Sequence, residues 1–283
     1  MAAVSARCNH RSAPESVIHN RLLDLAVRRT TPKGRARRTL YRWVDLVDVI
    51  GRRTTSSGYP PAALRFRVHG DLELEGFLAS GRQCSEDIQT SLAAVGTDLN
   101  SFDRVLDFGC GCGRTLLSFD PDSTGCELFG TDIDEEAIAW CRASLEQATF
   151  SLNGEEPPLD FPDGFFDLVY AVSVFTHLPE PLQLEWLQEL RRVTGPGGLV
   201  LLTVRGPSYA DTLPPEKREE LEARGFAFSP MPAHLQHLFP AWYQTATMNE
   251  DYIQRAWSDV FEVVRRIPQA VDGAQDMVVL RRP

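Results

Sequence analysis

Acidic and glycine residues stand at two places in the chain with the spacing that a ligand site needs. Asp107 follows an apolar run and precedes Gly109, Gly111 and Gly113, which alternate with other residues. Glycine lets a ligand approach the backbone closely and adopts dihedral angles that other residues avoid. A second acid, Asp132, ends the next apolar run. The pattern predicts a backbone cradle for a ligand, flanked by two carboxylates.

Two classes of ligand suit a glycine loop that is followed by an acid after the next strand. A dinucleotide needs G-x-G-x-x-G, in which the third glycine allows close helix packing under a pyrophosphate. Here Arg114 stands at that sixth position, and the Asp107 carboxylate would repel a pyrophosphate. A cation that carries an amino-acid group and a ribose fits better, because Asp107 attracts its ammonium and Asp132 accepts both ribose hydroxyls. Ile133 is then placed to pack on the adenine face.

These residues need strands and helices to position them. Val105, Leu106 and Phe108 predict a short buried strand before the glycine loop, which is expected to open into a helix at Arg114. Further strands are predicted at residues 127–131, 148–152, 166–174 and 199–204. Helices are predicted between them, one capped by Asp134 and one over residues 181–193. Such alternation predicts a doubly wound, mostly parallel sheet with helices on both faces, which binds ligands at the carboxyl ends of its strands.

The segments on either side of this core differ from it. A helical preface is expected, with helices over residues 40–50 and 85–95, the second capped by Ser85 and stopped by Gly96. Residues 206–258 show no strand pattern and are rich in proline, histidine and aromatic residues. An insertion of that length is uncommon unless it is functional, so it is a candidate substrate lid. Residues 260–266 and 276–281 are expected to pair as a hairpin at the sheet edge.

Length, charge and cysteine content bound the class of protein. The chain has 283 residues, 43% of them hydrophobic, which suits one large domain over residues 61–283 with an N-terminal extension over residues 1–60. We find no apolar run of the ~18 residues that a membrane span needs. Six scattered cysteines indicate reduced thiols and a cytoplasmic location.

The charge is unevenly distributed along the chain. Residues 1–67 hold 14 Lys and Arg side chains against four acids, whereas the rest holds 15 against 35. The basic segment is interpreted as a solvated leader, partly disordered or helical, since blocks of like charge usually stay disordered. A nucleic-acid-binding arm and an organelle transit peptide are the alternatives.

Four stretches carry a resemblance to a known family. They are Val-Leu-Asp-Phe-Gly-Cys-Gly-Cys-Gly (105–113), Gly-Thr-Asp-Ile-Asp (130–134), Phe-Asp-Leu-Val-Tyr-Ala-Val-Ser-Val-Phe-Thr-His-Leu (166–178) and Arg-Val-Thr-Gly-Pro-Gly-Gly (192–198). Residues 102–204 thus resemble the core of class I S-adenosylmethionine-dependent methyltransferases. The resemblance implies a Rossmann-like, seven-stranded sheet with an antiparallel last strand, and S-adenosyl-L-methionine as cofactor.

The resemblance also assigns site residues. Those that would line the amino-acid tail of the cofactor are Asp107, Gly109, Cys110, Gly111 and Gly113. Asp132 and Ile133 would hold the ribose and adenine, and Asn153 would contact the adenine edge. Ser173, in the fourth-strand run, is a further cofactor candidate. No metal ligand is assigned, because Cys110 and Cys112 lack a second cysteine pair.

Histidines are the candidates for a general base. His177 follows the fourth predicted strand, and the ordinary pKa of histidine suits proton removal near neutral pH. The alternative is that His177 only shapes the turn before Pro179. His234 and His237 in the insertion are further candidates. Arg65, Arg67 and His69 in the preface would either cover the ligand site or have surface and packing roles.

The predicted function is methyl transfer to a small-molecule acceptor, at an oxygen or nitrogen of a metabolite, sugar or aromatic compound. A nucleic-acid methyltransferase that uses the basic arm is an alternative. Two features disfavour it. Amino-directed DNA methyltransferases have Asp/Asn-Pro-Pro-Tyr after the fourth strand, where this chain has Ala171-Val172-Ser173-Val174. The rest of the chain is acidic and would repel a phosphate backbone. A non-catalytic S-adenosylmethionine-binding protein is the second alternative, since a fold does not fix a function. The acceptor and the oligomeric state are left open.

Overall fold

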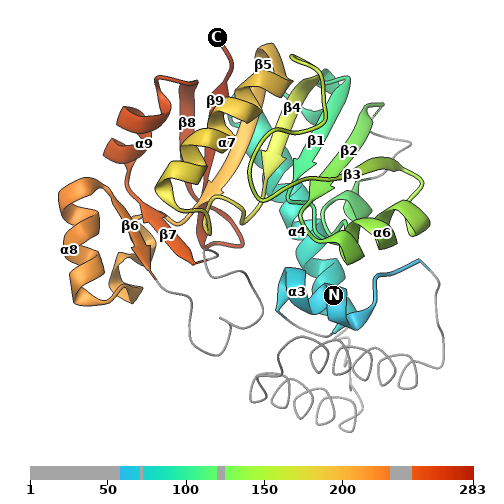
Figure 1. Ribbon diagram of the computed structural model, residues 1–283, viewed down its shortest axis with the longest axis horizontal. Helices are drawn as coiled ribbons and strands as arrows, with labels where there is room; N and C mark the ends of the chain where they lie inside the picture. The colour runs from blue at the N-terminus through green and yellow to red at the C-terminus, as the bar shows by residue number, and fades with distance from the viewer. Residues whose placement is uncertain (1–57, 71–72, 120–124, 230–243) are drawn as a thin grey trace, which may run out of the picture. The chain divides into compact units, whose positions relative to one another are not determined.

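The computed structural model describes residues 58–70, 73–119, 125–229 and 244–283 (Figure 1). The expected helix over residues 40–50 and nearly all of the basic N-terminal extension lie outside the described residues. Within them, seven strands form one sheet in the order β3-β2-β1-β4-β5-β9-β8. The strands are β1 (Arg104–Phe108), β2 (Glu127–Asp132), β3 (Ala148–Leu152), β4 (Phe166–Ala171), β5 (Thr194–Val204), β8 (Glu262–Val271) and β9 (Gln275–Arg281).

The sheet has the predicted parallel core and antiparallel edge. β1 pairs in parallel with β2 and β4, β2 with β3, and β4 with β5. β9 runs antiparallel to both of its neighbours, β5 and β8, so the last two strands form the expected hairpin. The predicted doubly wound, mostly parallel sheet is confirmed. The carboxyl ends of β1, β2, β3 and β4 meet at one edge, where the acids and glycines lie.

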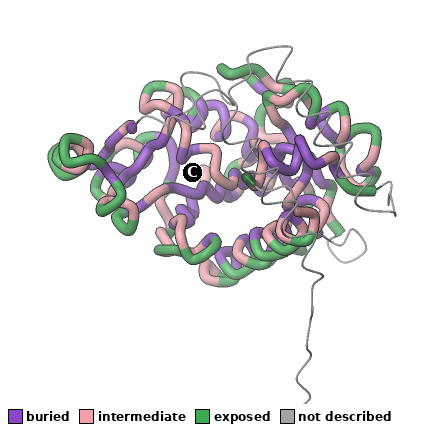
Figure 2. Tube along the Cα trace, turned by 90° about the horizontal axis from the view of Figure 1, so that it is seen from below, coloured by how far each residue is buried: buried purple, intermediate pink, exposed green. Residues whose placement is uncertain are grey.

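Helices cover both faces of the sheet. α7 (Glu180–Val193) and α9 (Glu250–Trp257) pack on one face, where Trp186 and Trp257 are buried against Leu106 and other strand side chains. α4 (Leu74–Ala93) and α6 (Glu135–Ser144) pack on the opposite face through Ile88 and Cys141. Successive strand residues alternate between the two cores, as the pleat of a strand requires. Figure 2 shows buried residues facing the interior and exposed residues on the outer sides of the helices.

Three predicted elements differ from the structure. The predicted helix over residues 85–95 is the second half of α4, and its supposed N-cap, Ser85, is buried inside that helix. The residues around Arg114 form turns and a short 3₁₀ helix, Leu116–Ser118, instead of beginning an α-helix. β4 ends at Ala171, three residues early, because Ser173 has a φ of 62° that no strand accommodates.

The insertion contains strands that the sequence pattern did not reveal. It holds a 3₁₀ helix (Pro207–Thr212), α8 (Pro215–Arg224) and an antiparallel pair, β6 (Phe226–Ser229) with β7 (Thr245–Met248). Four-residue strands are too short for their alternation to be distinguished from chance. The backbone N–H groups of Ala246 and Met248 donate to the carbonyls of Thr176 and Arg205, which ties β7 to the segments that follow β4 and β5. His234 and His237 lie outside the described residues.

The preface contributes a second helix besides α4. α3 (Ala62–His69) ends at Gly70, whose φ of 76° gives the left-handed cap that glycine favours. Leu64 of α3 and Phe77 of α4 share a small buried cluster with Cys112 and Ala137. The preface therefore packs beside the glycine loop. None of the helices in the described part of the chain has the length and hydrophobicity to span a bilayer.

Candidate active site

The glycine loop is held between the turn after β4 and helix α3. Its three glycines have φ values of 80°, 55° and 76°, all in the left-handed region. A Cβ atom on Gly109 would lie 2.3 Å from Cγ2 of Val174, and one on Gly111 would lie 2.5 Å from Cγ2 of Val68. The Gly109 and Cys110 N–H groups both donate to the Thr131 carbonyl, at 2.8 and 2.9 Å. The loop is thus fixed to the end of β2 and leaves no room for side chains at these glycines.

Two of the predicted loop residues, Cys110 and Gly113, offer no side chain to a ligand at this edge of the sheet. The Cys110 side chain is buried in the core beneath the loop, where its Sγ lies against Gly130. A Cβ on Gly113 would lie 2.6 Å from Cδ1 of Leu145, so Gly113 serves the packing against α6. Any contact of these two residues with a ligand would come from the backbone.

Gly111→Ala is expected to disturb both the backbone and helix α3. The new methyl group would overlap Val68, and a residue other than glycine is strained at a φ of 55°. We expect a loss of stability of about 1–3 kcal/mol, measured by urea unfolding. Val68→Ala in the same chain would remove the overlap and leave the backbone strain. Partial recovery in the double variant supports this packing, whereas unchanged stability of Gly111→Ala contradicts it.

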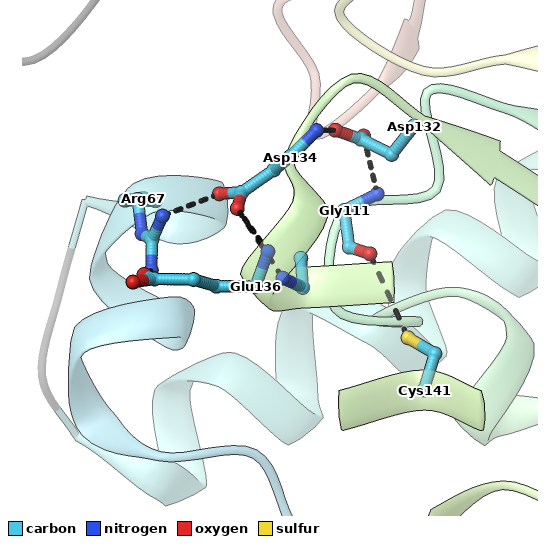
Figure 3. A network of polar contacts seen from close by, with 7 residues as sticks. Arg67, Gly111, Asp132, Asp134, Glu136 and Cys141 are labelled. Atoms are coloured by element: carbon cyan, nitrogen blue, oxygen red, sulfur yellow. Dashed lines mark hydrogen bonds and ion pairs between the residues drawn. The ribbon is translucent and has the colours of Figure 1, made fainter. Parts of the chain in front are cut away.

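The Asp132 carboxylate lies at the end of β2 with both oxygens fixed. Oδ2 accepts a hydrogen bond from the Gly111 N–H at 2.7 Å, and Oδ1 accepts one from the Asp134 N–H at 2.8 Å (Figure 3). An ionised carboxylate offers about four acceptor positions. Its two oxygens therefore retain capacity for a pair of neighbouring hydroxyls, such as those of a ribose. Burial raises the pKa of Asp132, and the two backbone donors oppose that change.

Asp107 is the second acid of the site and is buried. It lies on β1 between Gly130 of β2 and Tyr170 of β4, with 3% of its surface exposed. Burial raises the pKa of its carboxyl group to about 7, while the Tyr170 hydroxyl and the Arg114 charge oppose that change. A buried carboxylate without a bound cation is costly. A cationic ligand would stabilise its charged form.

Two apolar side chains are exposed next to Asp132. Ile133 follows β2 and is 40% exposed, and Leu152 ends β3 and is 45% exposed. The two strands are neighbours, and Leu152 pairs with Asp132. Asn153 follows, and its buried Oδ1 has no hydrogen-bond partner among the described residues. An apolar surface beside an unused acceptor suits adenine, which has apolar faces and an amino group. The sequence prediction missed Leu152, although its place before Asn153 at a strand end was a usable signal.

The turn after β4 is held in an unusual backbone conformation. Ser173 has a φ of 62°, which costs a residue other than glycine about 1 kcal/mol or more. Its N–H donates to Oγ1 of Thr203 at 2.7 Å, and its Oγ accepts a hydrogen bond from Nε2 of Gln275 at 2.8 Å. Strain of this kind is concentrated at functional sites. Gln275 begins β9, 102 residues from Ser173, and the sequence carried no signal for this contact.

His177 is held by the insertion. Its Nδ1 lies 2.7 Å from the carbonyl oxygen of Gln244, just before β7. A carbonyl oxygen only accepts hydrogen bonds, so Nδ1 carries the proton and Nε2 is the basic nitrogen. Burial lowers the pKa of His177 to about 4; the Gln244 carbonyl opposes this change and the Arg205 charge adds to it. His177 is therefore a neutral imidazole at pH 7.

The donor set fits S-adenosylmethionine. The strand ends bring together Asp107 for a cationic tail, Asp132 for a diol, and exposed apolar side chains for an adenine. The glycine loop lies between the two acids in the sequence. Val174 packs on Gly109 and Val68 packs on Gly111, so neither glycine has room for a side chain. Of the predicted site residues, Ser173 lies on the turn that packs against this loop, and His177 follows it.

Comparison with known proteins finds methyltransferases similar to the central part of the chain. The methyltransferase domain family matches residues 106–202. A sterol 24-C-methyltransferase of Schizosaccharomyces pombe is 33% identical over 122 residues, which are 39% of this chain and 30% of that protein. A ribosomal protein L11 methyltransferase of Ralstonia nicotianae is 33% identical over 154 residues, which are 50% of this chain and 48% of that protein. The chain spans less than half the length of the curated relatives that it matches.

A solved structure shows the same fold. It is magnesium protoporphyrin IX methyltransferase from Synechocystis with bound S-adenosylhomocysteine, which is similar with a TM-score of 0.52 and 18% identity. The similarity covers 77% of this chain and 93% of that one. At that identity it supports the Rossmann-like architecture alone. Residues 106–202 thus match a methyltransferase domain, and they lie in a sheet with the Rossmann-like architecture of this solved methyltransferase.

Proposed function

We propose that the chain transfers a methyl group from S-adenosylmethionine to a small-molecule acceptor, at an oxygen or nitrogen of a metabolite, sugar or aromatic compound. The observation that carries cofactor binding is the Asp132 carboxylate, whose two oxygens are each fixed by one backbone N–H beside the exposed Ile133 and Leu152. The acidic balance of residues 68–283 favours a small molecule over a phosphate backbone.

Each residue of the site has a distinct part in this proposal. Asp107 binds the ammonium group, Asp132 the ribose hydroxyls, Ile133 and Leu152 the adenine face, and Asn153 the adenine edge. When bound, S-adenosylmethionine supplies an electrophilic methyl group on a sulfonium. The chain holds the acceptor in line with that methyl group and keeps water away. In this proposal Nε2 of His177 accepts a proton from an acceptor hydroxyl as the methyl group is transferred, and burial makes it a weaker base than the ordinary histidine that the sequence suggested.

Isothermal titration calorimetry tests cofactor binding directly. We expect S-adenosylmethionine and S-adenosylhomocysteine to bind with one site per chain and NADH not to bind. Binding of NADH without either sulfur ligand would contradict the proposal. A methyl donor labelled in the methyl group, incubated with separate small-molecule, RNA and protein fractions, then tests the acceptor class. Label in the small-molecule fraction alone supports the proposal, and label in RNA or protein alone overturns its acceptor part.

His177→Ala is expected to separate cofactor binding from turnover. The affinity for S-adenosylhomocysteine should change less than about twofold, because the proposal assigns His177 to the acceptor. The turnover of an acceptor that must lose a proton should fall by about 10²–10⁴-fold. Since the pKa of His177 is about 4, wild-type turnover should not decline between pH 7 and pH 5.5 through this group. A decline centred near pH 6.5 that disappears in His177→Ala would contradict this assignment.

A further inference from the structure

Helix α3 is joined to the first turn of α6 by one arginine. Nη1 of Arg67 lies 2.6 Å from Oδ2 of Asp134, and its Nη2 lies 2.6 Å from Oε2 of Glu136 (Figure 3). The Arg67 and Asp134 side chains are 15% and 24% exposed, so their ion pair is largely shielded from solvent, whereas Glu136 is 60% exposed. The partners are 67 and 69 residues away in sequence. Arg67 thus connects the preface to the helix that begins just after the Asp132 carboxylate.

Asp134 passes this contact on to Asp132. Its Oδ1 caps α6 by accepting from the N–H groups of Glu136 and Ala137, while its Oδ2 accepts from Arg67. With both oxygens engaged, the residue is fixed, and its backbone N–H donates to Oδ1 of Asp132 at 2.8 Å. The guanidinium therefore orients the donor that holds one oxygen of Asp132.

The next residue of α3 bears on the other oxygen. Val68 packs on Gly111, so closely that a Cβ on this glycine would lie 2.5 Å from Cγ2 of Val68. The Gly111 N–H donates to Oδ2 of Asp132 at 2.7 Å. Two successive residues of α3 thus support the two donors that hold the two oxygens of one carboxylate.

Charge gives Arg67 a second effect on the same group. Residues 132–136 carry four carboxylates, on Asp132, Asp134, Glu135 and Glu136. An arginine there opposes the dipole of α6, whose N-terminus favours negative charge, so support of the helix alone is a poor reason for it. Its guanidinium instead pairs with Asp134 and Glu136 and offsets part of the negative charge that is gathered next to Asp132.

We infer that Arg67 is a positioning residue for cofactor binding, which holds the Asp132 carboxylate in the orientation that a ribose diol needs. This inference rests on the proposed function, because the diol belongs to S-adenosylmethionine. Arg67 acts through Asp134 and does not itself contact the cofactor. Helix α3, which lies outside the matched domain, is thereby part of the cofactor site.

Calorimetry with S-adenosylhomocysteine on single variants of the full chain tests the inference. Arg67→Met keeps the apolar stem and removes the fork, and we expect about fivefold to tenfold weaker binding, in the range of coupling within one hydrogen-bonded network. Arg67→Lys keeps the charge but lacks the planar guanidinium that fixes both carboxylates in one geometry, so its affinity should be intermediate. Asp134→Asn keeps a good helix cap, weakens the bond to Arg67 and should lower the affinity in the same way, and it carries the test if Arg67→Met does not fold.

Arg224→Met is the matched control. Arg224 of α8 also bridges two carboxylates, those of Glu180 and Glu220, at a distance from the cofactor strands in the fold. Its loss should leave the affinity unchanged, and it should lower the melting temperature less than Arg67→Met does, because Arg224 is 55% exposed and Arg67 15%. An affinity of Arg67→Met within twofold of wild type would overturn the inference. So would equal losses of affinity in Arg67→Met and Arg67→Lys that are proportional to the fall in melting temperature of each variant. Failure of wild type to bind S-adenosylhomocysteine would instead overturn the proposed function.

Discussion

Asp132→Ala is expected to weaken S-adenosylhomocysteine binding by at least about 100-fold, as measured by calorimetry. Two hydroxyls lose a charged acceptor, and hydrogen bonds to charged groups contribute about 1.5–3 kcal/mol each. The Gly111 and Asp134 N–H groups that fix the carboxylate also lose their partner. The glycine loop would then be less well ordered around any ligand that still binds.

The melting temperature separates this effect from unfolding. Asp132→Ala leaves the Gly111 and Asp134 N–H groups without their acceptor, so it should melt below wild type but remain folded at the temperature of the binding measurement. Asp160→Ala is the control, because Asp160 is an exposed acid on the loop between β3 and β4. An affinity of Asp132→Ala within threefold of wild type would remove Asp132 from the cofactor site.

Asp107→Asn is expected to make the free protein more stable at pH 8. The Asp107 carboxyl has a pKa of about 7 in the folded chain against an ordinary 3.8, because it is buried. The folded state therefore keeps a proton that the unfolded state releases, and the free energy of unfolding falls as the pH rises from about 4 to 7. The change in pKa corresponds to at most about 4 kcal/mol. Asparagine resembles the neutral acid and does not incur this loss.

Unfolding in urea at several pH values measures this effect. The two proteins should be about equally stable near pH 4, and the advantage of Asp107→Asn should grow up to pH 7 and then remain constant. A variant that is less stable than wild type at pH 8 would contradict a buried, weakly compensated carboxylate at this position.

The same variant should bind the cofactor worse. Asparagine cannot pair with an ammonium group as an anion does, and we expect about 10- to 100-fold lower affinity for S-adenosylhomocysteine at pH 7.5. In wild type, the affinity should rise between pH 5.5 and 7.5 as Asp107 ionises. In Asp107→Asn this rise should be absent. Stability gained together with affinity lost would identify Asp107 as a residue retained for binding.

Local patterns were sufficient to predict the central strands and the residues at their ends. Val105, Leu106 and Phe108 are buried on β1, and Asp134 caps α6 as its sequence context indicated. Strand alternation and helix caps are encoded within a few residues, and a parallel sheet then brings the strand ends to one edge. The predicted cluster of acids and glycines followed from these rules.

Long-range contacts were not predictable in this way. From the sequence, Arg67 was expected either to cover the ligand site or to have a surface or packing role. In the structure its side chain forms ion pairs with Asp134 and Glu136. Gln275 reaches Ser173 across 102 residues. No periodicity or cap signal links residues so far apart, because such pairs depend on how whole elements pack. The left-handed backbone of Ser173, after which no strand continues, is likewise held by a distant residue, because its N–H donates to Oγ1 of Thr203.

The turn at Ser173 has a consequence for the smallest fragment of the chain that can work. Its two supports come from β5 and from β9, the last strand, while Arg67 and Val68 lie far before the domain match at residues 106–202. A chain cut to the matched residues would lose Arg67 and Val68 of α3 and the contact of Gln275 with Ser173. It would also expose an unpaired edge on β5, because β9 would be missing. The site therefore depends on contacts between residues that are far apart in the sequence. It belongs to nearly the whole described chain and cannot be transplanted as a module.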